Sequence, residues 1–143
     1  MDPRHHARQC AVQVLFQIEL GGQNVDEAFS LYWHDRSVGQ EVREMAERLV
    51  RGTISRKQQI DRLIVGISEH WRLERMAAVD RNILRLAVYE FLQEPCTPRI
   101  VVIDEAIDLA KKFGGEDSGQ FVNGVLDSLR KSLEEKPRSR LVP

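Results

Sequence analysis

The sequence has few cysteines and no long apolar run, and each scarcity excludes a class of protein. Cys10 and Cys96 lie far apart, with neither a CxxC motif nor a Cys/His cluster around them. This excludes a disulfide scaffold and a structural zinc site, and it predicts reduced thiols in a cytoplasmic protein. No stretch approaches the roughly 20 apolar residues of a membrane span. The N-terminus lacks the apolar run of a signal peptide, so we expect no membrane association.

An excess of positive charge is also missing. Lys and Arg number 21 against 22 for Asp and Glu, which gives a formal net charge of −1. Such a chain cannot coat nucleic acid through its overall charge, so any binding to RNA must come from a local patch. Its 143 residues suit one domain, which we place at residues 1–135. Residues 136–143 are expected to form a disordered tail, and whether its final LVP is native stays open.

What is present is apolar periodicity of the helical kind. Apolar residues recur at the i, i+3, i+4, i+7 spacing, and no convincing alternation of a strand is found. We therefore predict an all-α fold, a compact single-domain bundle of about seven helices. The apolar residues of 83–92 surround the whole helix, so this helix should be the buried centre. The other helical stretches are 7–18, 26–34, 42–67, 102–113 and 122–133.

Glycines, prolines and capping residues predict where the helices begin and end. Gly21-Gly22 should end the first helix. Residues 42–67 form one long helix or two nearly collinear ones, with Gly52 and Gly66 as weak points. The remaining signals are N-caps at Asp80, Thr97 and Asp117, Pro98 at a first helical position, and Gly114 as a left-handed C-cap.

No arrangement of residues indicates catalysis. Asp104, Glu105 and Asp108 are clustered, but no Glu-x-x-His pair accompanies them, and a solvated helix face explains them better than a metal site. The four histidines fit no zinc or triad pattern. The glycines between 114 and 124 follow a helix rather than a strand, so they do not form a phosphate loop. We predict no enzyme activity, no metal and no cofactor.

One interhelical stretch, KKFGGEDSGQF at 111–121, contains more than a turn requires. Phenylalanines flank a helix start whose N–H groups could receive an anion, and lysines precede it. Aromatic rings beside basic groups are how proteins hold single-stranded RNA. Each charge alone is better explained as a solvated helix face than as a ligand site, so the pattern by itself gives only a weak indication of RNA binding. The candidate RNA-binding residues here are Lys111, Lys112, Phe113 and Phe121, with Arg4 and Arg8 on the first helix.

Three blocks of the sequence resemble the NusB family of bacterial transcription antitermination factors. They are ARQCAVQVLFQIE, DRNILRLAVYE and IDEAIDLAKKFGGEDSGQFVNGVLD, in the order and spacing of that family. The resemblance implies a compact helical protein without catalytic activity. It also implies pairing with NusE, a small-subunit ribosomal protein, and joint binding to the single-stranded boxA element of nascent RNA. That complex joins the RNA polymerase antitermination assembly and supports ribosomal RNA synthesis.

The resemblance also assigns residues. It implies RNA contacts for Arg4 and Arg8 and for Asp117 and Phe121, and it places Phe16 and Asp80 on the face toward NusE. Where many relatives have a run of arginines, this chain has Pro-Arg-His-His-Ala-Arg. Fewer fixed charges predict weaker binding to RNA alone, with a pH-dependent part.

Two other functions stay open at this point. NusB-like domains also form the N-terminal part of certain ribosomal RNA cytosine methyltransferases, so this chain could be such a domain in isolation. A purely structural helical interaction module would show no affinity for RNA. The resemblance further allows a homodimer, which could cover the RNA-binding surface.

Overall fold

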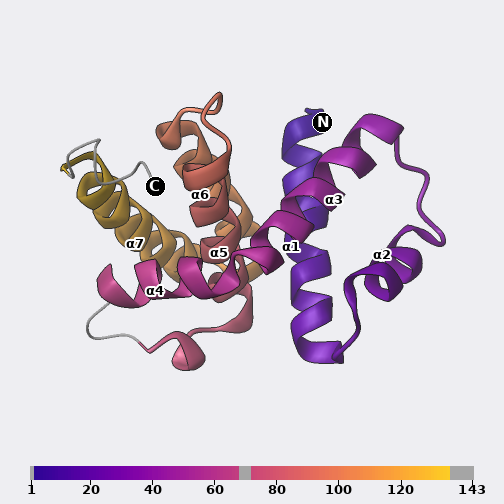
Figure 1. The fold of residues 1–143 in the computed structure, drawn as a ribbon, viewed down its shortest axis with the longest axis horizontal. Coiled ribbons are helices and arrows are strands. Elements are labelled where there is room, and N and C mark those ends of the chain that lie inside the picture. Colours follow the sequence, from indigo (N-terminus) through magenta and orange to yellow (C-terminus); the bar gives the residue numbers. More distant parts are fainter. Residues whose placement is uncertain (1, 68–71, 136–143) are drawn as a thin grey trace.

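The computed structural model describes residues 2–67 and 72–135; the predicted tail lies outside them. The described residues form seven α-helices, one 3-10 helix and no strand, which confirms the all-α prediction. None of these helices combines the length and apolar character that crossing a membrane requires. In chain order (Figure 1), they are α1 (Pro3–Gly21), α2 (Val25–Trp33), α3 (Gln40–Ser55), α4 (Lys57–Ile67), η1 (Leu73–Arg75), α5 (Ala78–Gln93), α6 (Arg99–Gly114) and α7 (Glu116–Glu135).

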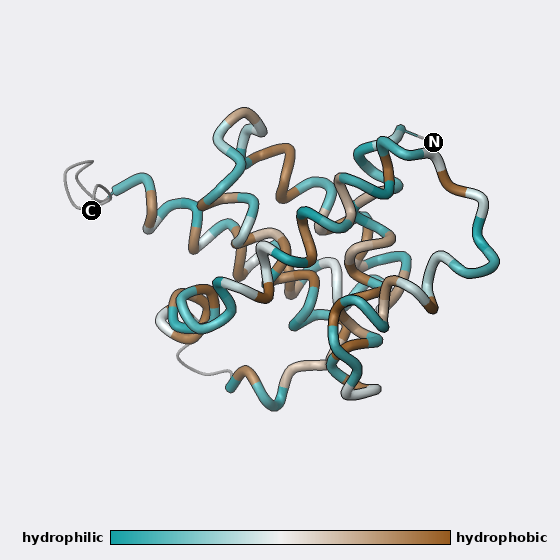
Figure 2. The backbone as a smooth tube through the Cα atoms, turned by 45° about the vertical axis from the view of Figure 1, so that its right-hand side comes forward, coloured by the Kyte–Doolittle hydropathy of each residue, from teal (hydrophilic) through white to brown (hydrophobic). Residues whose placement is uncertain are grey.

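Helix α5 lies at the centre of the molecule and packs against α1, α3, α4, α6 and α7. All residues from 82 to 91 are buried, polar ones included. The prediction of a buried central helix is therefore confirmed, and the exposed fractions of Ile83 and Leu86 are 1% and 2%. The outer helices instead alternate between hydrophobic and hydrophilic residues along the backbone (Figure 2), as helices with one buried face do.

The stretch 42–67 is divided into two helices at Arg56 rather than at Gly52. A methyl group at Gly52 would overlap the ring of Tyr89, so this glycine lets α3 and α5 approach closely. The last turn of α3 is weakened instead by its hydroxyl groups. Thr53 Oγ1 donates to the Leu49 carbonyl at 2.7 Å and Ser55 Oγ to the Gly52 carbonyl at 3.0 Å. Such bonds compete with the backbone ladder and bend helices.

The predicted end of α1 is confirmed, but two predicted starts are wrong. Gly22 has the left-handed φ of 70° and ends α1. Helix α5 begins at Ala78 after Ala77, so Asp80 lies within its first turn and caps nothing. Helix α6 begins at Arg99 with Pro98 as its N-cap, and Thr97 lies outside the helix. Ala77 and Pro98 have the non-helical backbone angles of an N-cap, but neither side chain carries an acceptor, so both helices start without a side-chain cap.

The packing of Gly52 on Tyr89 leads to the first prediction. Gly52→Ala should lower the free energy of unfolding by about 1–3 kcal/mol, because the added methyl overlaps a buried ring. Gly124→Ala is the matched control, since nothing lies within 4 Å of its Cβ position. That substitution should raise stability by up to about 1 kcal/mol through helix propensity alone. Equal stabilisation of both variants in urea unfolding would contradict this account of the α3–α5 contact.

Candidate functional site

The junction between α6 and α7 is a single residue, Gly115. Its φ of 96° and ψ of −176° lie in a region that is essentially restricted to glycine. Its N–H donates to the Lys111 carbonyl at 3.1 Å, and its own carbonyl accepts from Gly119 N–H at 3.2 Å. The turn therefore uses the backbone groups of both helices. The predicted caps Gly114 and Asp117 are therefore wrong: Gly114 is helical, and Asp117 lies in the first turn of α7 instead of capping it.

Two further glycines bring the helices close at this junction. A methyl group at Gly114 would overlap the Ser118 side chain, and one at Gly119 would come within 2.8 Å of Lys111 Cγ. The stem of Lys111 thus covers Gly119, which is buried although the lysine itself is exposed. This close packing fixes the direction in which the first turn of α7 presents its side chains.

A hollow of about 550 Å³ lies between the start of α5 and the start of α7. It brings the predicted RNA-binding residues Asp117 and Phe121 together with Asp80, which was predicted to face the protein partner. Asp117 is exposed, whereas Phe121 is half-buried and packs against the core. We call this the α5–α7 hollow; its lining is Arg75, Met76, Ala77, Asp80, Asp117, Ser118, Gln120 and Phe121.

Asp80 is the most unusual side chain in the α5–α7 hollow. Its exposed fraction is 8%, yet its Oδ1 atom has no hydrogen-bond partner among the described residues. The Cβ position of Gly114 lies 3.5 Å from this oxygen, so the end of α6 lies close enough for a methyl group there to be in van der Waals contact with it. An unpaired buried acceptor is destabilising, and at a functional site it indicates a group that a ligand or partner completes.

A second, apolar depression of about 600 Å³ runs along α1. Phe16 lies in it, half-buried, and so does Phe113 from the end of α6. Leu20 contributes a side chain that is 63% exposed. We call this the α1 groove; it is lined by Val12, Gln13, Phe16, Gln17, Leu20, Gly21, Tyr32, Arg36, Val79 and Phe113.

The two depressions adjoin each other. Val79 lines the α1 groove and the next residue, Asp80, lines the α5–α7 hollow. Phe113, predicted to contact RNA, thus lies beside Phe16, predicted to contact protein. The predicted RNA and partner residues therefore alternate over one continuous surface instead of occupying separate faces.

Several basic residues lie in or near this surface. Arg75 lines the α5–α7 hollow and Arg36 lines the α1 groove, and both are exposed. Arg4 and Lys111 are exposed. Lys112 Nζ donates to Gln9 Oε1 at 3.0 Å and lies 5.9 Å from the centre of the Phe113 ring. His5 Nδ1 pairs with Glu105, so one carboxylate of the acidic cluster on α6 serves a contact between α1 and α6. Among the described residues no group of three or more His, Cys, Asp or Glu side chains is placed to hold a metal.

Arg8 is buried, contrary to its expected place on the polar side of α1. Its Nε lies 3.1 and 3.0 Å from the two carboxylate oxygens of Glu90, and one terminal nitrogen lies 2.9 Å from Oε1. Glu105 adds a weaker charge contact at 3.8 Å. Burial alone would lower the pKa of Arg8, but the hydrogen bonds and charge of Glu90 raise it overall. With an exposed fraction of 3%, this guanidinium is not available to an RNA phosphate.

The sequence did not lead us to predict a role for Glu90 or for several residues that line the two depressions. An acid inside the mostly apolar helix 83–92 is itself a signal, because a buried carboxylate requires a cation close by. Arg75, Met76 and Tyr32 had no such signal, since their role depends on which distant segments meet. Tyr32 donates to Gln13 Oε1 from α2, and burial with a hydrogen bond to Cys10 raises its pKa.

Comparisons with known proteins agree on one family. The model described as "NusB family" matches residues 5–131. The transcription antitermination protein NusB of Anaeromyxobacter sp. (strain Fw109-5) is 48% identical over 136 residues, which cover 94% of each chain. NusB of T. maritima superposes with a TM-score of 0.85 at 39% identity, over 97% of this chain and 96% of that one. A chain in the crystal structure of NusB and NusE with dsRNA superposes with a TM-score of 0.83 at 32% identity, over 92% of this chain and 98% of that one.

The buried ion pair between α1 and α5 leads to the second prediction. Glu90→Gln keeps the shape but leaves the buried Arg8 charge unpaired, which should lower the free energy of unfolding by about 3–5 kcal/mol. Glu134→Gln is the control, because Glu134 is half-exposed in its pair with Arg130 at 3.0 Å. That change should alter stability by less than about 0.5 kcal/mol. If chemical denaturation gives similar small effects for both variants, the pair does not anchor α1.

Proposed function

The chain belongs to the NusB family, and from that premise we propose that it is a transcription antitermination factor that binds single-stranded boxA RNA together with NusE. It acts by binding and catalyses no reaction. The pair joins the antitermination assembly on RNA polymerase and supports ribosomal RNA synthesis. This role places the protein in the cytoplasm.

The observation that carries this proposal is the meeting of Asp117, Phe121 and Asp80 in the α5–α7 hollow. A half-buried ring at a depression can stack on an unpaired base, and stacking tolerates any base. The carboxylate of Asp117 accepts hydrogen bonds from base amino groups and repels phosphates, so it favours the base side of the strand. Arg4, Lys111 and Lys112 border the surface and attract the RNA backbone.

Arg8 has an indirect role in this proposal. Its pairing with Glu90 holds the N-terminal half of α1 against α5, and Glu105 of α6 lies near the same guanidinium. The exposed cation Arg4, one turn before it, is positioned by this anchor. Arg8 therefore supports the RNA surface without contacting the strand.

NusE is assigned to the α1 groove. This depression is mostly apolar, and it exposes Leu20 beside the half-buried Phe16. Aromatic anchors in such pockets carry much of the energy of protein interfaces. Asp80 lies at the border with the hollow, where a donor from NusE or from RNA can satisfy its unpaired oxygen. The two ligands would then lie next to each other on this protein.

The alternative functions have less support. The curated relatives that match over 91% to 98% of this chain are named as antitermination proteins, not as methyltransferases. A purely structural module leaves unexplained why an unpaired carboxylate and a half-buried ring share one hollow. Binding to boxA RNA separates these alternatives from the proposed function.

The third prediction concerns the ring in the α5–α7 hollow. Phe121→Leu keeps most of the apolar bulk that packs on the core but removes the stacking surface. Stacking is worth about 1–3 kcal/mol per base, so boxA affinity in the presence of NusE should fall about tenfold. Phe29→Leu removes a buried ring of α2, stacked on Trp33, and should leave RNA affinity unchanged. Normal RNA binding by a destabilised Phe121→Leu variant would show that the ring serves only the core.

The fourth prediction concerns the partner surface. Phe16→Ala should weaken NusE binding by about tenfold or more, as loss of an interface anchor does. Leu31→Ala is the control, because Leu31 is 59% exposed on α2 and does not line the groove. Calorimetric titration with NusE measures both variants. Equal affinity of Phe16→Ala and the wild type would remove the α1 groove from the interface.

A charge test at Asp80 needs a conservative substitution. Because Asp80 is buried, a lysine there would disturb the fold and confuse the result. Asp80→Asn retains the shape and one acceptor oxygen while removing the charge. A fall in NusE affinity with RNA affinity retained would assign the charge to the protein partner, and the reverse would assign it to RNA.

A further inference from the structure

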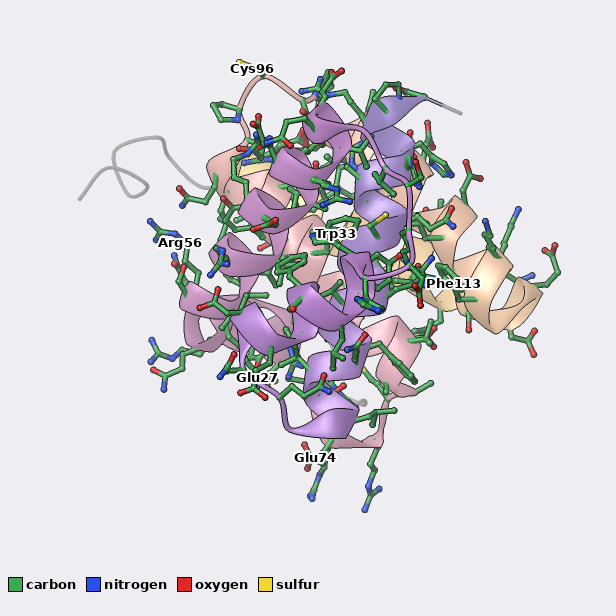
Figure 3. All side chains as sticks on the ribbon, turned by 90° about the vertical axis from the view of Figure 1, so that its right-hand side faces the viewer. Glu27, Trp33, Arg56, Glu74, Cys96 and Phe113 are labelled. Carbon is green, nitrogen blue, oxygen red and sulfur yellow. The ribbon has the colours of Figure 1, made fainter. Side chains whose placement is uncertain are left out.

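A second group of cations lies at the junction between α3 and α4. Arg56, Lys57 and Arg62 are exposed, and none of their side chains forms a hydrogen bond or an ion pair with a described residue. In Figure 3 Arg56 and Phe113 are on opposite sides of the molecule. We call these three residues the α3–α4 basic patch, which is distinct from the surface proposed above for RNA and NusE.

The basic patch brings three cations, unpaired among the described residues, together at one junction of an almost neutral chain. Other arginines on α3 are paired: Arg48 lies 2.7 Å from Glu94 and Arg51 lies 2.6 Å from Asp26. A hollow of about 590 Å³ follows the patch, and its lining contains no carboxylate. Besides the cations it offers the amides of Gln58 and Gln59 and the hydroxyl of Ser55.

The charge of this patch comes from side chains. Helix α3 ends at Ser55 and α4 begins at Lys57, so the negative end of one helix adjoins the positive end of the next. These two dipole ends largely cancel. Two guanidinium groups and one ammonium remain, and guanidinium forks with neighbouring amides suit the oxygens of a phosphate diester.

The surface proposed for boxA offers the exposed cations Arg4, Arg75 and Lys111 for such phosphates, but its other charges are less available. Arg8 is bound to Glu90 and Lys112 to Gln9, while Asp117 and Asp80 add negative charge. Affinity for single-stranded RNA depends strongly on the number of phosphates that a protein neutralises. Cations on the opposite face would therefore add phosphate contacts to the few that the face holding the bases supplies.

We propose that the α3–α4 basic patch binds phosphates of RNA flanking the boxA element, independently of their sequence. This inference rests on the proposed function, because boxA must first be held in the α5–α7 hollow. The flanking strand then passes around the molecule to the patch. RNA that contains boxA alone does not reach it.

The test compares boxA RNA with the same RNA extended by an unstructured homopolymer on either side, in the presence of NusE. The patch variant is Arg56→Gln/Lys57→Gln/Arg62→Gln, since glutamine has a similar helix propensity. The control is Arg48→Gln/Arg51→Gln/Lys131→Gln. It removes the same charge from exposed cations that already have acidic partners, including Asp127 at 3.2 Å from Lys131.

The wild type and the control should bind extended RNA more tightly than boxA alone, and the patch variant should bind both equally. Because the patch variant loses three phosphate contacts, its salt slope for extended RNA should be smaller than that of the wild type by about 2. The extra affinity that flanking RNA gives the wild type should therefore shrink at least about tenfold between about 50 and about 200 mM salt. No gain for the wild type, or a full gain for the patch variant, would overturn the inference. If the control variant loses this gain to the same extent, overall charge and not the patch explains the effect, and the inference is wrong.

Two further outcomes are distinguishable. If the patch variant loses affinity for NusE while the gain from flanking RNA persists, the patch is a protein contact and the inference is wrong. If the wild type binds neither RNA, the proposed function fails, and this inference fails with it.

Discussion

The ion pair between Arg8 and Glu90 determines how α1 lies on the central helix. Burying one charge in a helical core is strongly unfavourable unless its partner is buried with it, so the pair fixes one register. A second anchor lies near the other end of α1, where Glu19 accepts from Arg81 at 2.8 Å and from Asn82 at 2.8 Å. Burial alone would raise the pKa of Glu19, but these hydrogen bonds lower it overall.

The two anchors explain why a groove is left between them. Arg8 meets Glu90 late in α5, and Glu19 meets Arg81 early in it, so the two helices run antiparallel. Phe16 lies between the two anchors on α1. Val79, at the start of α5, lines the same groove. The first turn of α5 also carries Asp80 into the neighbouring hollow. The position of α1 thus determines the shape of the α1 groove, and the start of α5 joins that groove to the hollow.

The sequence predicted the helices well, because burial of an apolar face is a local periodic pattern. It predicted their ends less well, because caps compete with longer-range packing. Gly52 looked like a weak point, but the ring of Tyr89 occupies the space beside it, and only the fold shows that contact. Arg8 looked like a surface cation because its partner is distant in the chain. The sequence pattern indicated Lys111, Lys112, Phe113 and Phe121, and the resemblance added Phe16, Asp80 and Asp117. How these residues interleave depends on segments that meet only in three dimensions.

A continuous surface for two ligands has an energetic consequence, since neighbouring sites that share residues are coupled. The central claim is that boxA RNA and NusE bind side by side across the α1 groove and the α5–α7 hollow. The most direct test is the affinity of the protein for boxA RNA with and without saturating NusE. The account predicts that NusE tightens RNA binding by about 5- to 150-fold, and that RNA tightens NusE binding by the same factor. Binding of each ligand with no effect on the other would contradict the claim.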